Sequence, residues 1–194
     1  MSLSKWRVRL QEYVVNSILS KESIHVLDCG CGVGYGVVFV AKSQRRSVVG
    51  VDVSKTAIQR ATARVRQMDV EKAADLIRCD VLSLPLRPDL FDAAFCVLLI
   101  DAFQDLKRPL NEVANVVKHG GKLIVADLDP AALSMITIGK FIQYLDRKSG
   151  HPYKLHKSSE IEKELSRLGF TQITIQRKHF GFSPPTYIMA ARRT

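Results

Sequence analysis

The stretch from Val26 to Gly36 (VLDCGCGVGYG) constrains the fold of this chain more than any other. An apolar run ends in an acid, and glycines then follow at alternate positions. Because glycine has no Cβ, it accepts positive φ and lets the backbone approach a ligand closely. The apolar residues Tyr35 to Lys42 predict a helix whose free N–H groups favour anionic ligand groups. The stretch therefore predicts a strand, a ligand-binding loop and a helix at the carboxyl edge of a parallel sheet, with a tight turn that binds no ligand as the alternative.

The glycine spacing disfavours a dinucleotide site. In the dinucleotide fingerprint G-x-G-x-x-G, the third glycine would be Tyr35 counted from Gly30, and Val37 counted from Gly32. Neither position is glycine. A loop for a different nucleotide-containing cofactor is therefore expected.

An acid two positions before G-x-G-x-G is the pattern that the residues match, with Asp28 followed by Gly30, Gly32 and Gly34. This resembles the first motif of the class I S-adenosylmethionine-dependent methyltransferases. The resemblance implies S-adenosyl-L-methionine as the cofactor. Its methionine end would lie against the loop backbone, including Cys31, with Asp28 near its ammonium group.

Length and composition favour one domain. With 194 residues and 46% apolar residues, the chain fits a single α/β domain over 1–194. Residues 1–21 are expected to form an amphipathic N-terminal helix, with Trp6, Leu10, Tyr13, Val14 and Ile18 at helical spacing. This segment has no continuous apolar core, so neither a secretory signal nor a membrane span is predicted, and a cytoplasmic protein is expected.

The four cysteines, Cys29, Cys31, Cys79 and Cys96, fall in or beside apolar runs. Cysteine in such runs commonly acts as a small buried apolar residue. The C-x-C pair lacks the C-x-x-C spacing of zinc and redox sites, so no metal and no disulfide are predicted.

The net charge of +10 is concentrated near the C-terminus. Residues 140–194 hold 11 Lys and Arg against four Asp and Glu. A basic region of this kind attracts an anionic substrate or nucleic acid, and a solvated basic surface is the alternative.

Acids also end the next two expected strands. Ser47 to Asp52 (SVVGVD) is β-branched and is followed by Ser54, a candidate helix N-cap. Asp52 is placed to accept hydrogen bonds from ribose hydroxyls, or alternatively to stabilise the next helix dipole. Residues 76–81 (LIRCDV) predict a third strand. The family resemblance implies that Asp80 and Val81 contact adenine, and Val53 with Val81 could supply the flat apolar slot that adenine needs.

The most apolar run, 90–100 (LFDAAFCVLLI), predicts the fourth and central strand, buried on both faces. Cys96, Val97 and Leu98 would border the methionine end of the cofactor. Methyltransferases related to ubiquinone and menaquinone biosynthesis often carry histidines just past this strand, where this chain has Asp101 and Ala102. By its place, Asp101 is the candidate general base.

The remaining segments complete the expected sheet. Residues 122–127 predict a fifth strand, and 130–157 form an insertion that acts as a lid over the substrate, a dimer face or a lipid-facing surface. Ser159 and Glu162 suggest a capping box. Two closing strands then resemble the hairpin of this family. The fold expected is a Rossmann-like, seven-stranded and mostly parallel sheet with a C-terminal antiparallel hairpin and helices on both faces.

The predicted activity is methyl transfer from S-adenosylmethionine to a small acceptor, amphipathic or anionic in character. Two alternatives stay open. The basic C-terminal segment favours an RNA or protein methyltransferase, and a cofactor-binding partner subunit without catalysis is the second alternative. The sequence specifies neither the acceptor nor the oligomeric state, for which a dimer is one candidate.

Overall fold

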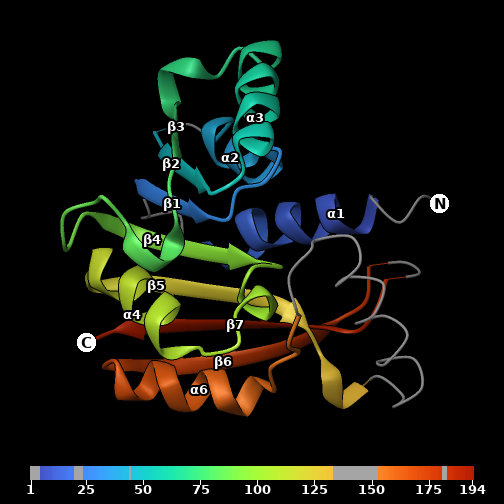
Figure 1. Ribbon diagram of the computed structural model, residues 1–194, viewed down its shortest axis with the longest axis vertical. Helices are drawn as coiled ribbons and strands as arrows, with labels where there is room; N and C mark the ends of the chain where they lie inside the picture. The colour runs from blue at the N-terminus through green and yellow to red at the C-terminus, as the bar shows by residue number, and fades with distance from the viewer. Residues whose placement is uncertain (1–4, 20–23, 44, 133–152, 181–182) are drawn as a thin grey trace.

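The computed structural model describes residues 5–19, 24–43, 45–132, 153–180 and 183–194. Seven strands form one sheet in the order β3-β2-β1-β4-β5-β7-β6, which Figure 1 shows stacked from top to bottom. The strands are β1 (His25–Cys29), β2 (Ser47–Asp52), β3 (Ala74–Arg78), β4 (Phe91–Val97), β5 (Val117–Leu128), β6 (Phe170–Lys178) and β7 (Thr186–Arg193). Neighbours among β1 to β5 are parallel, whereas β7 is antiparallel to both β5 and β6. The predicted fold class is therefore confirmed.

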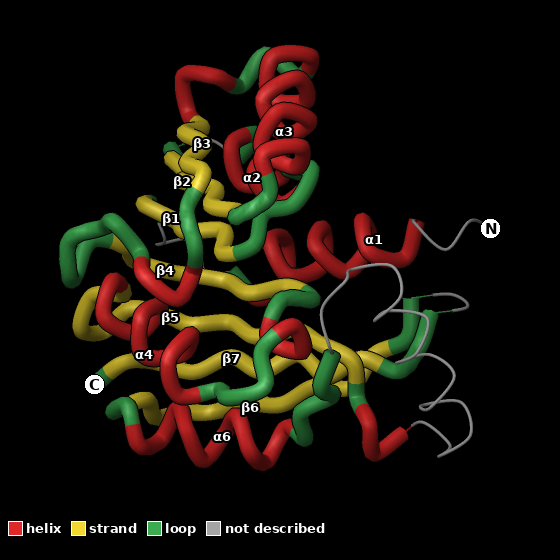
Figure 2. Tube along the Cα trace, viewed as in Figure 1, coloured by secondary structure: helices red, strands yellow, loops and turns green. Residues whose placement is uncertain are grey.

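Helices lie on both faces of the sheet (Figure 2). They are α1 (Lys5–Tyr13), α2 (Tyr35–Ala41), α3 (Lys55–Gln67), α4 (Lys107–Val116) and α6 (Ser158–Arg167). A π-helical turn (Val14–Ile18) continues α1, and short 3₁₀ turns span Glu71–Ala73, Val81–Ser83, Ile100–Ala102 and Pro130–Ala132.

Each face of the sheet has its own apolar core. Alternate strand residues such as Leu123 pack against α4 and α6, while their neighbours such as Ile124 pack against α1, α2 and α3. This division follows from the two-residue period of a strand. The central strand β4 is buried along nearly its whole length, as predicted for a strand covered on both faces.

Parallel pairing is what creates the functional edge. Cys29 of β1 lies in register with Val51 of β2 and with Cys96 of β4. The segments that leave these strands at their carboxyl ends therefore emerge at one edge of the sheet. This edge is on the right in Figure 1, where the arrows of β4 and β5 point.

Two strand ends differ from the prediction. The third strand stops at Arg78, and Val81 begins a 3₁₀ turn that the Asp80 side chain caps through the amide of Leu82. The fourth strand stops at Val97, because Leu98 has a φ of 56° and turns the chain out of the sheet.

One prediction about the start of a helix is wrong. Helix α6 begins at Ser158 after Lys157, and no side chain caps it, so Ser159 and Glu162 do not form a capping box. By contrast, Ser54 caps α3 as predicted, accepting a hydrogen bond from the amide of Ala57.

Most of the 130–157 insertion, including Tyr144 and His151, lies outside the described residues. Its described end runs through residues 153–157 and joins the sheet edge, where the Lys154 amide donates to the Asp101 carbonyl. Among the helices described, none is both long and apolar enough to cross a bilayer.

Candidate functional site

A cavity of about 450 Å³ opens at the carboxyl edge of the sheet. Its lining residues lie at or just after the carboxyl ends of β1, β2, β3 and β4, and one more comes from the far end of the insertion. The lining residues are Gly30, Asp52, Val53, Asp80, Val81, Leu82, Leu99, Ala102, Phe103, Gln104 and Tyr153. Five of these were predicted as site residues from the sequence: Gly30, Asp52, Val53, Asp80 and Val81.

The glycine loop runs along one side of this cavity with three left-handed residues, Gly30, Gly32 and Gly34. Their φ values of 69°, 53° and 81° are strained for residues with a Cβ. A Cβ on Gly34 would lie 2.9 Å from Ala61 of α3, so the loop is pressed against that helix. A Cβ on Gly32 would meet nothing within 4 Å, so the space beside Gly32 is open.

Asp52 fastens the loop to the end of β2. Its Oδ2 accepts a hydrogen bond from the Gly32 amide at 2.9 Å, and its Oδ1 accepts one from the Ser54 amide at 2.9 Å. Each carboxylate oxygen has a second lone pair. Asp52 can therefore hold the loop and still accept hydrogen bonds from a ligand in the cavity.

Asp28 lies beneath the loop and does not line the cavity. Its side chain is buried, and Oδ2 has no hydrogen-bond partner among the described residues. A Cβ on Gly36 would lie 2.6 Å from this oxygen, which shows how closely helix α2 approaches it. Burial, together with the nearby charge of Asp52, raises the pKa of Asp28 to about 8.

Arg64 is a residue of this region that sequence reasoning missed. Its guanidinium lies 3.5 Å from the centre of the Tyr35 ring and donates a 3.0 Å hydrogen bond to the Val33 carbonyl. It thus holds the end of the glycine loop against α3. The apolar periodicity of α3 did not indicate this role. Such a pattern separates the outward face of a helix from its core face, but it does not show which other segment packs on the outward face.

The far side of the cavity is more apolar. Val53 is 63% exposed, and it lines the cavity together with Val81 and Leu99. Asp80 is exposed, and its Oδ1 accepts from the Leu82 amide at 2.9 Å. Its other oxygen is open to a donor from a ligand.

The structure does not bring every predicted residue to this cavity. Cys96 and Val97 are buried in the sheet, and Cys31 is buried where its amide donates to the Val51 carbonyl. Leu98 turns away and lines a separate cavity of about 60 Å³, next to Asp101. All four lie at or just beyond the strand ends, where sequence alone could not specify which way each side chain points.

Asp101 forms a carboxyl pair with Asp127, the acid near the end of β5. Both are buried, and burial raises the pKa of each. Asp127 Oδ2 accepts from the Ile100 amide at 2.9 Å, and such bonds oppose the rise in pKa at Asp127. The charge of Asp127 and a hydrogen bond to it add to the rise in pKa at Asp101. Asp101 is therefore protonated near neutral pH, and its Oδ2 has no hydrogen-bond partner among the described residues.

Asp127 could have been found from the sequence, because it closes an apolar strand as Asp52 does. Tyr153 and Phe103 could not. Tyr153 lines both the larger and the smaller cavity, although it is more than 50 residues away from Leu99 in the chain. His156, considered on the lid, is buried and its Nε2 lies 2.8 Å from the Phe103 carbonyl, so it supports the cavity wall instead.

The residues present fit S-adenosylmethionine. Asp52 retains acceptor capacity for ribose hydroxyls, and Val53, Val81 and Leu99 provide apolar walls for a flat ring. The open space at Gly32 lets a ligand approach the backbone closely. The orphaned oxygen of Asp28 leaves a buried negative partner available to a positive charge.

The comparisons with known proteins agree with this chemistry. The sequence family described as "Methyltransferase domain" matches residues 27–125. A protein of Arabidopsis thaliana named "Probable thiol methyltransferase 2" is 33% identical over 157 residues, covering 80% of this chain and 62% of that protein. A demethylmenaquinone methyltransferase of Bacteroides fragilis is 24% identical over 176 residues, covering 80% and 71%.

Solved structures show the same fold. The magnesium protoporphyrin IX methyltransferase of Synechocystis PCC 6803, crystallised with bound SAH, superposes with a TM-score of 0.75 at 19% identity, covering 100% of this chain and 89% of that one. The chain spans only 37%, 45% and 62% of three curated relatives that it matches. The family match nevertheless covers half of the chain, from β1 into β5 and so through the glycine loop and the acids that follow β2 and β3. This chain belongs to the class I S-adenosylmethionine-dependent methyltransferase family.

Proposed function

We propose that this chain transfers a methyl group from S-adenosylmethionine to a small-molecule acceptor. The observation that carries the proposal is the cavity at the carboxyl edge, where the glycine loop and Asp52 face an apolar wall. A polar side suits the ribose and the amino acid part of the cofactor. An apolar side suits the adenine ring and a methyl acceptor.

Different residues of the site bind different parts of the cofactor. Asp52 accepts from the ribose hydroxyls, Asp80 accepts from the adenine amino group, and the Val81 amide meets the ring. The loop backbone holds the methionine end, and the buried Asp28 offsets its positive charge. The bound cofactor supplies a methyl group already activated by its sulfonium. The protein mainly has to align the acceptor with that methyl group and exclude water.

A small acceptor is favoured by the scale and lining of the site. Leu99, Phe103 and Tyr153 are apolar or aromatic lining residues, and Leu99 packs against Gly30 of the glycine loop. Relatives named for sterol, thiol and demethylmenaquinone substrates all act on small molecules. An amphipathic acceptor fits this wall, with its apolar part against Phe103.

We propose a positioning role for Asp101 in place of the predicted general base. A carboxyl group that holds its proton at neutral pH cannot accept another there. Asp101 instead lies beside Asp127, with which it can share a proton, and its Oδ1 accepts from the His156 amide at 3.1 Å. These contacts join the turn Ile100–Ala102 to β5 and to the end of the insertion, and so support the wall at Ala102 and Phe103.

Replacing Asp52 should weaken cofactor binding. Asp52→Asn removes a charged acceptor, and we expect the Kd for S-adenosylhomocysteine to rise about 10- to 100-fold in calorimetric titration. Asp75→Asn, an exposed carboxylate on β3, is the matched control and should leave the Kd within twofold. Equal binding by the wild type and Asp52→Asn would remove Asp52 from the site.

Cofactor affinity should depend on pH through Asp28. Below pH 8 this carboxyl is protonated in the free protein, and a ligand ammonium favours the ionised form. Raising the pH from 6 toward 8 should therefore tighten S-adenosylmethionine binding by up to about tenfold per unit, and the affinity should fall again above about pH 8, where the α-amino group of the ligand loses its proton. In Asp28→Asn this slope should vanish. A slope retained in Asp28→Asn would mean that another group titrates.

The acceptor class can be tested directly. Incubating the protein with cofactor labelled in its methyl group and with fractionated cell extract should place the label in the small-molecule or lipid fraction. Label in RNA or protein would overturn the proposed acceptor class. Tight cofactor binding with no label transferred to any fraction would contradict the enzyme and indicate a binding subunit.

Two substitutions distinguish a positioning role of Asp101 from a role as general base. Turnover is measured with the acceptor that becomes labelled in the preceding experiment. Asn can still donate to Asp127 and accept from the His156 amide, so Asp101→Asn should turn over within about threefold of the wild type and should not shift the pH profile. Asp101→Ala removes the carboxyl beside Asp127 and leaves the His156 amide without its acceptor, and we expect it to lose about 1–3 kcal/mol of unfolding free energy and to raise the KM for the acceptor. If turnover instead fell by about two orders of magnitude or more in a folded Asp101→Asn, Asp101 would be the general base after all.

A further inference from the structure

A second and larger cavity lies away from the proposed cofactor site. It measures about 550 Å³ and lies at the opposite edge of the sheet, where β4 and β5 begin and β7 ends. Its lining residues are Asp92, Lys118, His119, Gly120, Gly121, Lys122, Gln172, Thr174, Ala190, Ala191 and Arg192. We call it the basic groove. It shares no lining residue with the cofactor cavity.

The charge of the basic groove is positive. Lys118, Lys122 and Arg192 oppose one carboxylate, Asp92. Asp92 already accepts from Lys118 Nζ at 2.7 Å and from the amides of Ile24 and His25. Although desolvation opposes it, hydrogen bonds from the His25 amide and Lys118 lower the pKa of Asp92, so it stays ionised. Two positive charges in excess remain in the groove lining.

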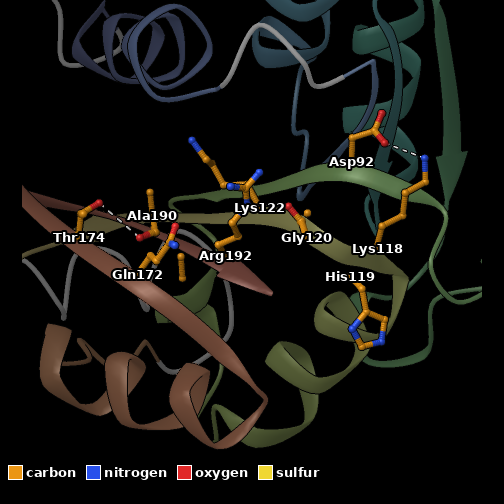
Figure 3. Close-up of a pocket in the computed structure, with 11 residues that line it drawn as sticks. Asp92, Lys118, His119, Gly120, Lys122, Gln172, Thr174, Ala190 and Arg192 are labelled. Carbon is orange, nitrogen blue, oxygen red and sulfur yellow. Dashed lines mark hydrogen bonds and ion pairs between the residues drawn. The ribbon is translucent and has the colours of Figure 1, made fainter. Parts of the chain in front are cut away.

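The sheet register places two of these cations side by side. Lys122 of β5 is the direct partner of Arg192 in β7. Residues opposite each other in an antiparallel pair point to the same face with their Cβ atoms about 5 Å apart, and like charges there destabilise the pair. Figure 3 shows the two side chains together in the middle of the groove, with Asp92 and Lys118 at one end and Gln172 and Thr174 at the other. An anion between Lys122 and Arg192 would meet both cations.

The donor chemistry fits an oxyanion. Arg192 Nε donates to the Gly120 carbonyl at 2.9 Å, which holds the guanidinium while its terminal N–H groups remain to bind two oxygens. The Gln172 amide adds a neutral donor at the far end, whereas the Thr174 hydroxyl already donates to the Ala190 carbonyl at 3.4 Å. A volume of 550 Å³ lies within the range of small-molecule sites.

We propose that the basic groove binds a small organic phosphate that carries at least two negative charges. A small molecule is favoured over RNA because none of the described residues lining the groove is Phe, Tyr or Trp, and only His119 and Arg192 among them present a planar group on which a base can stack. The ligand would bind independently of the cofactor, since the two cavities lie at opposite ends of the parallel strands.

Inorganic pyrophosphate is the probe for the test. Calorimetric titration in low salt should give a Kd below about 1 mM for the wild type, and Lys122→Gln and Arg192→Gln should each weaken binding at least tenfold. Lys163→Gln on α6, which makes the same charge change at an exposed position, should leave the Kd within twofold. Thermal unfolding of each variant verifies that it is folded.

The outcomes separate the groove from the methyltransferase site. S-adenosylhomocysteine should bind Lys122→Gln and Arg192→Gln as it binds the wild type, so a failure of cofactor binding and a failure of the groove are seen independently. No binding of pyrophosphate, or equal weakening in Lys163→Gln, would overturn the proposal. A single-stranded RNA oligomer that binds more than tenfold tighter than pyrophosphate, with loss in Arg192→Gln, would reassign the groove to nucleic acid.

Discussion

The two hydrogen bonds that the Asp52 carboxylate accepts hold the cofactor side of this molecule together. One ties it to the glycine loop at Gly32, and the other to Ser54 at the start of α3. The loop on its own is three left-handed glycines with little to define its shape. Through Asp52, the end of β2 determines where the loop backbone lies, and through Arg64 and Ala61 helix α3 closes over it. The ligand cavity is bounded by this arrangement.

Buried carboxyl groups characterise the rest of the carboxyl edge. Asp28, Asp101 and Asp127 are each at most 2% exposed, and burial raises the pKa of all three. Oδ2 of Asp101 and Oδ2 of Asp28 both lack a hydrogen-bond partner among the described residues, but Asp101 lies beside Asp127, with which it can share a proton, whereas Asp28 lies beneath the glycine loop. Such a group is costly in a resting protein and is best explained by a ligand charge that it meets on binding.

Predictions that rested on local chemistry agreed with the structure. The strand, the glycines and the following helix are specified by residues next to one another, and Ser54 caps α3 because its partner Ala57 is three positions away. Predictions that depended on where a strand ends or on which way a side chain points agreed less well. The run 90–100 is apolar throughout, so nothing in it indicated that the strand would end at Val97 and that Leu98 would turn toward another cavity. One prediction from local chemistry failed: the Ser159 and Glu162 pattern was present, but the N-cap is Lys157, two residues before Ser159, so the pattern is not used.

The sequence by itself determined the family, the order of strands and helices, and the acids at the carboxyl ends of β1, β2 and β3, because each depends on spacing within one short segment. The tertiary structure alone decided which residues meet. Parallel register brings Gly30, Asp52 and Asp80 to one cavity, and distant chain segments add Phe103 and Tyr153 to it. It also pairs Asp101 with Asp127, and antiparallel register sets Lys122 against Arg192 at the other edge. Contacts between strands depend on the order and register of all the strands in the sheet. The residues that determine this order and register are spread over the entire chain.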